Sequence, residues 1–184
     1  MHGVVIAIVI AWAVFWIYWL LSALAAKPGR GTAWRRGASV RFVLFAAWFI
    51  FVRLTGFKAQ GVSASAPWLT WLGLALFVVG LGLAVWARLY IGRNWGTPMS
   101  QKDDPELVTT GPYRTIRHPI YTGIILGMIG TALAISLWGL IVAAVLAGYF
   151  TYSAFTEERN MAATFPDTYP AYRASTKMLI PFVF

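Results

Sequence analysis

The sequence predicts an all-α, polytopic membrane helix bundle with about five transmembrane helices, and three observations support this. Hydrophobic residues make up 59% of the 184 residues and charged residues only 11%. The apolar residues form long runs, several of them near the roughly 20 residues that a helix needs to cross a bilayer. Lysine and arginine gather in the intervals between these runs, as expected beside a membrane. An ordinary soluble domain is therefore excluded.

The first two runs predict the orientation of the chain. Residues 4–26 are apolar, aromatic and too long for a cleaved signal peptide, so we expect a retained first span. The basic side chains of the next interval are Lys27, Arg30, Arg35, Arg36 and Arg41. The positive-inside rule places this interval in the cytoplasm and the N-terminus outside. A short second span is expected over residues 42–54, with Arg53 snorkelling toward the outer interface.

The third span, about residues 68–90, is predicted to pack closely against another helix. Small residues recur along it, and such residues allow two helix backbones to approach. They are Gly73, Gly80, Gly82 and Ala84. The chain then returns to the cytoplasmic side at Arg88 and Arg93, and the polar interval of residues 92–117 follows. This interval is long for a connection in a compact domain, which favours a functional role.

The fourth and fifth spans are predicted to form a tight hairpin. Residues 119–134 contain Gly123, Gly127 and Gly130, again at spacings that suit close helix packing. Residues 137–155 follow after a very short connection, and the run ends at Glu157-Glu158 on the cytoplasmic side. The C-terminal segment around residues 165–177 is amphiphilic and too short to span again. It is expected to fold over the polar interval and close a pocket.

Residues 111–121 concentrate the polar chemistry of the chain. Pro119 suits the first position of a helix, which places Arg117 and His118 at a helix N-terminus. The helix dipole and the charges of Arg114 and Arg117 together predict an anion site. The alternative is that these arginines only orient the helix or contact phospholipid head groups.

The hairpin is predicted to bring the acidic pair Glu157-Glu158 next to His118. Two carboxylates at a helix C-terminus oppose the dipole, so a compensating partner is expected. Arg117 or Arg159 could pair with one of them. Alternatively, one carboxylate accepts hydrogen bonds from the ribose of a ligand whose carboxylate or phosphate binds near His118. Aromatic residues that could stack on a base or attract a sulfonium are Trp95, Tyr113, Tyr121, Phe165, Tyr169 and Tyr172.

Three sequence features occur together in the second half of the chain. They are LVTTGPY at residues 107–113, RHPIYTG at residues 117–123, and the later Glu157-Glu158 pair. This combination resembles the isoprenylcysteine carboxyl methyltransferase family, which is related to the phospholipid N-methyltransferases. The resemblance covers residues 86 to the end, within one expected integral membrane domain of residues 1–184.

The resemblance implies S-adenosylmethionine as methyl donor, in a pocket that faces the cytoplasm. An amphiphilic or prenyl-like acceptor would enter from the membrane lipid, and the reaction would form S-adenosylhomocysteine. The implied catalytic residues are Arg117, which would hold the donor or steer the acceptor, and Glu158, a candidate base for an amine acceptor as is His118. The residues expected at the donor site are Val108, Gly111, Pro112, Tyr113, His118, Tyr121, Gly123, Glu157 and Glu158.

Two other functions stay open on the sequence. A membrane reductase with a nicotinamide cofactor could use Arg114 and Arg117 for a phosphate. A non-enzymatic bundle could bind anionic lipid through the basic interval that follows the first span. The chain has no cysteine and only two histidines, so no metal is expected. The basic residues lie between apolar runs, which argues against nucleic acid as a partner.

Overall fold

The computed structural model describes residues 2–24, 29–30, 66–95, 101–102 and 106–183, and these residues are mainly helical. The helices are α1 (His2–Leu24), α3 (Pro67–Ile91), α4 (Pro119–Ile135), α5 (Gly139–Thr164) and α6 (Tyr169–Ser175). Short 3-10 helices are η1 (Gly92–Asn94) and η2 (Gly111–Arg114). The strands β1 (Gly29–Arg30) and β2 (Gln101–Lys102) form a small antiparallel pair. The all-α prediction is confirmed apart from this pair.

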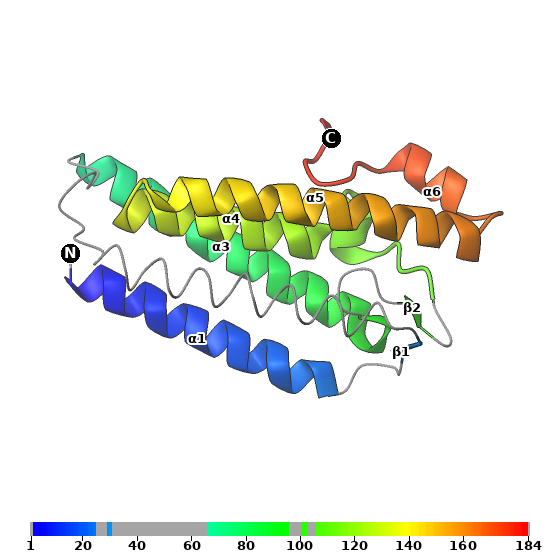
Figure 1. Ribbon diagram of the computed structural model, residues 1–184, viewed down its shortest axis with the longest axis horizontal. Coiled ribbons are helices and arrows are strands. Elements are labelled where there is room, and N and C mark those ends of the chain that lie inside the picture. The colour runs from blue at the N-terminus through cyan, green and yellow to red at the C-terminus, as the bar shows by residue number, and fades with distance from the viewer. Residues whose placement is uncertain (1, 25–28, 31–65, 96–100, 103–105, 184) are drawn as a thin grey trace.

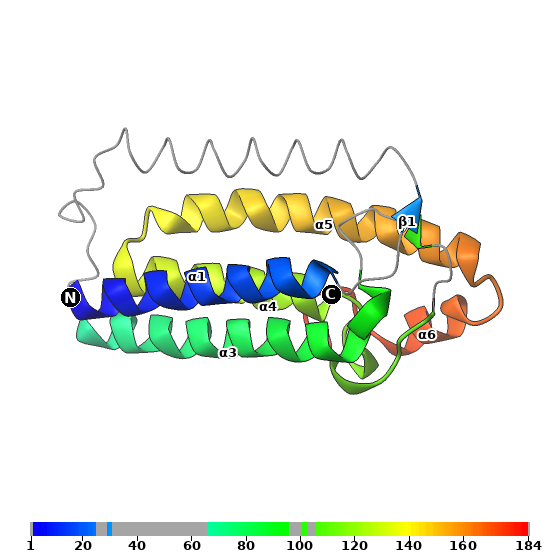
Figure 2. The ribbon, with the colours of Figure 1, turned by 90° about the horizontal axis from the view of Figure 1, so that it is seen from below.

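The long helices lie side by side along one axis (Figure 1). Helices α1 and α3 run in the same direction, and α4 runs in the opposite direction (Figure 2). The C-terminal ends of α1, α3 and α5 therefore gather with the start of α4 at one end of the bundle. We call this end the polar end; it comprises η2, residues 115–118, residues 157–164 of α5, α6 and the tail to residue 179.

The described residues contain fewer candidate membrane spans than the sequence predicts. Three helices are long and apolar enough to cross a membrane, over residues 2–22, 67–94 and 139–164. Helix α4 is apolar but has 17 residues, which is about 25 Å at 1.5 Å per residue. The predicted second span, residues 42–54, lies outside the described residues.

Helix α5 ends later than the apolar pattern predicts. Only residues 136–138 join α4 to α5, which confirms the tight hairpin. The predicted fifth run ends at Phe155, whereas α5 continues to Thr164. The added residues include Glu157, Glu158 and Met161, which are good helix formers although the segment is more polar. The end of an apolar run therefore marks where hydrocarbon contact stops, not where the helix stops.

Close contact between α3 and α4 forms the middle of the bundle, which we call the shaft. A methyl group built on Gly73 would lie 2.6 Å from the carbonyl oxygen of Gly130, and one built on Gly80 would lie 2.6 Å from that of Gly123. No side chain fits at these distances, so the predicted close packing is confirmed. The inclusion of Gly82 is wrong, because a methyl group there meets nothing within 4 Å. Two residues along a helix from Gly80, this position faces away from α4.

Helix α1 packs on the shaft through aromatic side chains. The Trp12 indole nitrogen donates a hydrogen bond to the Thr131 hydroxyl of α4 at 3.0 Å. Phe15 and Trp19 are buried together with Ala84 and Ala87 of α3. The hydrophobic core thus continues from the shaft to the polar end, where it meets the buried charges.

Candidate functional site

The start of α4 is held by the C-terminal tail. The backbone N–H groups of Arg117 and His118 donate to the carbonyls of Lys177 at 2.8 Å and Met178 at 3.1 Å. In return, the Lys177 N–H donates to the Thr115 carbonyl at 3.1 Å. The prediction that the C-terminal segment folds over the polar interval is confirmed. The expected anion site loses two backbone donors, because the N–H groups of Arg117 and His118 already have partners in the tail.

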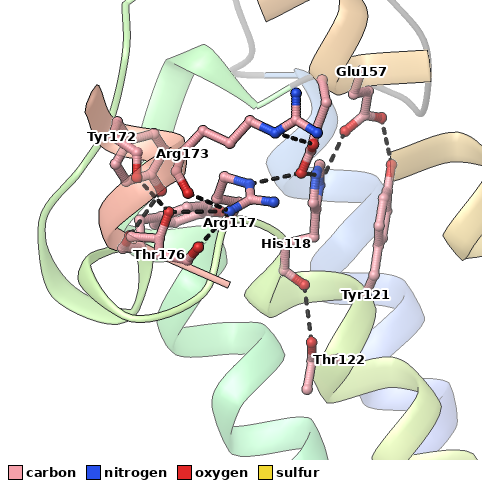
Figure 3. Close-up of polar contacts among 10 residues, drawn as sticks. Arg117, His118, Tyr121, Thr122, Glu157, Tyr172, Arg173 and Thr176 are labelled. Atoms are coloured by element: carbon pink, nitrogen blue, oxygen red, sulfur yellow. Dashed lines mark hydrogen bonds and ion pairs between the residues drawn. The ribbon is translucent and has the colours of Figure 1, made fainter. Parts of the chain in front are cut away.

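Arg117 joins three parts of the polar end. Its Nε donates to Oε1 of Glu158 at 2.6 Å, and both side chains are nearly buried. Its Nη1 donates to the carbonyl of Thr176 at 2.6 Å and to that of Arg173 at 3.2 Å. Figure 3 shows the guanidinium between the carboxylates of α5 and the tail. The alternative that Arg117 pairs with one of the glutamates is confirmed.

Glu157 and Glu158 lie inside α5 and not at its end. The expectation that they oppose the helix dipole is wrong, because α5 continues to Thr164 and the dipole acts mainly in the last turn. Their charges are compensated by side chains instead. Besides Arg117, the Nε of Arg173 lies 3.5 Å from Oε2 of Glu158. Arg173 is exposed, so this second pair contributes little.

His118 lies between the two carboxylates. Its Nδ1 is 3.5 Å from Oε2 of Glu157, and its Nε2 is 3.7 Å from Oε1 of Glu158. Burial lowers the pKa of His118, but the two neighbouring carboxylates raise it by more, so this pKa is above its ordinary value. The Nε2 atom is buried and has no hydrogen-bond partner. It is thus a polar atom that a ligand could satisfy.

Tyr121 extends the charged group into a row of rings. Its ring stacks on that of His118 with centroids 5.5 Å apart, and on that of Phe150 at 4.7 Å. Its hydroxyl donates to Oε1 of Glu157 at 2.5 Å. The Glu157 side chain is 25% exposed, so it is the more accessible carboxylate of the pair. We call these residues the polar cluster: Arg117, His118, Tyr121, Glu157 and Glu158.

The predicted segment around η2 packs against α3 and α6. Gly111 has φ +58°, a left-handed conformation that favours glycine, and it lies against the Tyr90 ring. Pro112 is buried, and the hydroxyl of the buried Tyr113 donates weakly to the Ala87 carbonyl at 3.4 Å. Val108 packs at the edge of the core cluster. Burial raises the pKa of Tyr113.

Gly123 lies at the close contact between α4 and α3. A methyl group on it would lie 2.6 Å from the Gly80 carbonyl oxygen and 2.7 Å from the Ala84 nitrogen. The structure thus places Gly123 at the contact with α3, while the polar cluster faces α5 and the tail. The motif of residues 117–123 therefore makes two different contacts, with α5 through Tyr121 and with α3 through Gly123.

Several polar contacts at this end were not anticipated from the sequence. The backbone carbonyls of Arg173 and Thr176 accept hydrogen bonds from Arg117. Every residue has such a carbonyl, so no pattern of side chains predicts which one accepts. The buried position of Arg88 was also missed, since it was read only as a charge at the membrane interface. A signal existed, because Arg88 precedes the helix-ending Gly92 by one turn. Among the described residues, no group of three or more His, Cys, Asp or Glu side chains could hold a metal.

Apolar helices with a charged cluster at one end define an integral, multi-pass membrane protein with a candidate site at that end. The chain belongs to the phospholipid methyltransferase family, whose model matches residues 68–168. The predicted resemblance is confirmed, and the match includes the whole polar cluster. This family includes methyltransferases.

Two similar proteins of known name refine this assignment. The chain is 36% identical over 122 residues to the cobalt-zinc-cadmium resistance protein CzcN of Cupriavidus metallidurans, covering 62% of this chain and 51% of that protein. It is 28% identical over 114 residues to protein-S-isoprenylcysteine O-methyltransferase of Schizosaccharomyces pombe, covering 60% of this chain and 48% of that protein. The chain thus spans about half the length of these relatives.

A solved structure shows the same fold. The eukaryotic intramembrane Ras methyltransferase ICMT (isoprenylcysteine carboxyl methyltransferase) superposes with a TM-score of 0.56 at 25% sequence identity. The match covers 85% of this chain and 55% of that one. The fold is therefore similar to that of this methyltransferase.

Proposed function

We propose that this protein transfers a methyl group from S-adenosylmethionine to an amphiphilic acceptor in the membrane. The acceptor would be an isoprenylcysteine-like carboxylate or a lipid head group. The observation that carries the proposal is the contact that His118, just before α4, and Tyr121 of α4 make with Glu157 of α5. Membership of a family that includes methyltransferases supports the same reaction.

The polar cluster suits the donor because its polar and aromatic groups match the parts of a nucleoside with a charged tail. The buried Nε2 of His118 has no hydrogen-bond partner and could donate to or accept from a ligand. The partly exposed Glu157 carboxylate could accept hydrogen bonds from ribose hydroxyls. Phe150 ends the row of stacked rings and is only partly buried, so its ring could offer a face to a base or a sulfonium. When bound, S-adenosylmethionine supplies an electrophilic methyl group on that sulfonium.

The chain's own residues would contribute positioning and electrostatics. Arg117 holds Glu158 and the tail together, so it keeps the second carboxylate beside His118. A carboxylate acceptor needs no base, because it gives up no proton on forming an ester. An amine acceptor must lose a proton, for which Glu158 and His118 are the candidate bases. Positioning of this kind accounts for a large part of the barrier reduction in displacement reactions.

The distribution of basic residues supports a cytoplasmic location for the polar end. Helices α1 and α5 both end at the polar end (Figure 1), and the basic residues from Lys27 to Arg41 follow α1 directly in the sequence. Under the positive-inside rule we place this end in the cytoplasm. The acceptor would then reach the polar cluster from the inner half of the bilayer.

Binding of the donor product tests the proposal directly. Purified protein in mild detergent is titrated with S-adenosylhomocysteine in a calorimeter, and in a parallel series with NADPH. We expect saturable binding of the first compound, about tenfold weaker in Glu157→Gln because a charge-assisted hydrogen bond is lost. Asp167→Asn removes an exposed acid after α5 and is expected to bind like the wild type. Saturable binding of NADPH alone would contradict the proposal and favour the reductase.

A further inference from the structure

Arg88 is a buried cation without an anionic partner in the described part of the chain. Its residue is only 4% exposed. Its Nη1 donates to the carbonyl of Gly92 and its Nη2 to that of Ser22, both at 2.6 Å. Its Nε is buried and has no hydrogen-bond partner. Carbonyl dipoles satisfy part of the guanidinium, but they carry no net negative charge to balance it.

A second buried arginine at the polar end, Arg117, does have the anionic partner that Arg88 lacks. Arg117 also donates to two backbone carbonyls, and in addition it pairs with the Glu158 carboxylate at 2.6 Å. Among the described residues, no carboxylate pairs with Arg88 as Glu158 pairs with Arg117. An uncompensated buried charge is costly, so an external anion is the expected partner.

A cavity that opens widely to the surface lies beside Arg88 and has room for such an anion. Its volume is about 230 Å³, far above the roughly 30 Å³ that one water molecule takes up in the liquid. The lining residues are Tyr18, Ser22, Arg88, Leu89, Gly92 and Arg93. Arg93 adds a second positive charge. The Trp95 ring, 4.8 Å from Cζ of Arg88, covers one face of the guanidinium and restrains it.

We propose that this cavity binds the anionic head group of a membrane lipid, with phosphate oxygens accepting hydrogen bonds from Arg88. Guanidinium groups suit phosphate because several N–H groups can donate to it at once. The cavity lies where two candidate membrane spans, α1 and α3, end side by side (Figure 2). Leu89 lines it and is 64% exposed, so an acyl chain has an apolar path along α3. The proposal does not depend on the proposed function, since it uses none of the polar cluster.

Lipid-dependent thermal unfolding tests this site without any methyl donor. Purified full-length protein in a neutral detergent is titrated with phosphatidylglycerol, phosphatidylcholine or inorganic phosphate. We expect only phosphatidylglycerol to raise the unfolding midpoint. In Arg88→Gln the half-saturating lipid concentration should rise about tenfold, as one charge-assisted hydrogen bond is lost. Arg159→Gln, which removes an exposed charge of α5 at the same end, should leave that concentration unchanged.

If Arg88→Gln does not fold, Arg93→Gln and Tyr18→Phe replace it in the test, because both residues line the same cavity. Each should also weaken the effect of phosphatidylglycerol, by severalfold. The proposal is overturned if phosphatidylcholine stabilises equally, or if all cavity variants that fold respond like the wild type. Equal stabilisation by inorganic phosphate would show a site for a free anion and would overturn the assignment to a lipid.

Discussion

The shaft and the polar end hold the same helices together by different physical means. In the shaft, α3 and α4 touch through glycine backbones, and the contact is specified by the absence of side chains. At the polar end, α4, α5 and the tail are joined through Arg117, His118 and Glu158, and the contact is specified by charge. Substitutions in the shaft should therefore act through volume, and those at the polar end through charge and protonation.

The two regions are mechanically connected through the first turns of α4. Gly123 lies against Gly80, only two residues after Tyr121 enters the polar cluster. The close shaft contact therefore determines where His118 and Tyr121 stand relative to α5. A site that depends on distances of a few tenths of an ångström gains from being built on such a rigid helix pair.

The largest expected effect is loss of the buried ion pair at the polar end. Arg117→Gln should lower the free energy of unfolding by about 3–5 kcal/mol, because it leaves the Glu158 carboxylate buried without its main partner. The double variant with Glu158→Gln should be more stable than Arg117→Gln alone, since no uncompensated charge remains. Unfolding in detergent micelles by a denaturing detergent measures both. Equal stability of the single and double variants would mean that charge does not control this contact.

A comparable loss is expected from a single methyl group in the shaft. Gly80→Ala should destabilise the protein by about 3 kcal/mol, because the new Cβ would meet backbone atoms of Gly123 and Gly127, which cannot rotate away. Gly82→Ala is the matched control on the same helix and should be neutral or stabilising by up to about 1 kcal/mol. The same unfolding measurement applies. Similar losses in both variants would show that helix propensity, not the close contact, is responsible.

Stability should depend on pH through His118. Since its pKa is raised in the folded state, the contribution of His118 is fully present below about pH 6.5 and is lost as the pH rises through the folded-state value. The unfolding midpoint of the wild type should therefore fall as the pH rises above about 6.5. His118→Gln should remove this slope, whereas Gly80→Ala should keep it. A slope that persists in His118→Gln would assign it to another group.

The smallest expected effect concerns one hydrogen bond between α6 and η2. The Tyr172 hydroxyl donates to the Tyr113 carbonyl at 2.7 Å, so Tyr172→Phe should cost about 1 kcal/mol. Tyr152→Phe on the exposed side of α5 should change the free energy of unfolding by less than about 0.5 kcal/mol. Protease sensitivity of the C-terminal tail provides an independent readout. An unchanged tail in Tyr172→Phe would mean that the backbone pairing beside Lys177 is sufficient to hold it.

The sequence predicted the parts of the fold that depend on local patterns. Apolar runs located α1, α3 and α4, because burial in hydrocarbon requires continuous stretches of apolar side chains. Pro119 correctly marked the start of α4, because a proline at the first position removes an N–H that lacks a partner there. The end of α5 at Thr164 was missed, because no apolar periodicity continues past the polar cluster.

The amino-acid sequence by itself determined the kind of protein, the positions of α1, α3 and α4, and the residues from which a site could be built. Only the tertiary structure decided that Glu158 neutralises Arg117, that Gly82 faces away from α4, and that Arg88 is buried beside a cavity. The physical reason is the distance along the chain over which each interaction acts. Backbone conformation and hydrophobicity act between near neighbours, whereas an ion pair between α4 and α5 or a cavity between α1 and α3 exists only once distant segments have packed together.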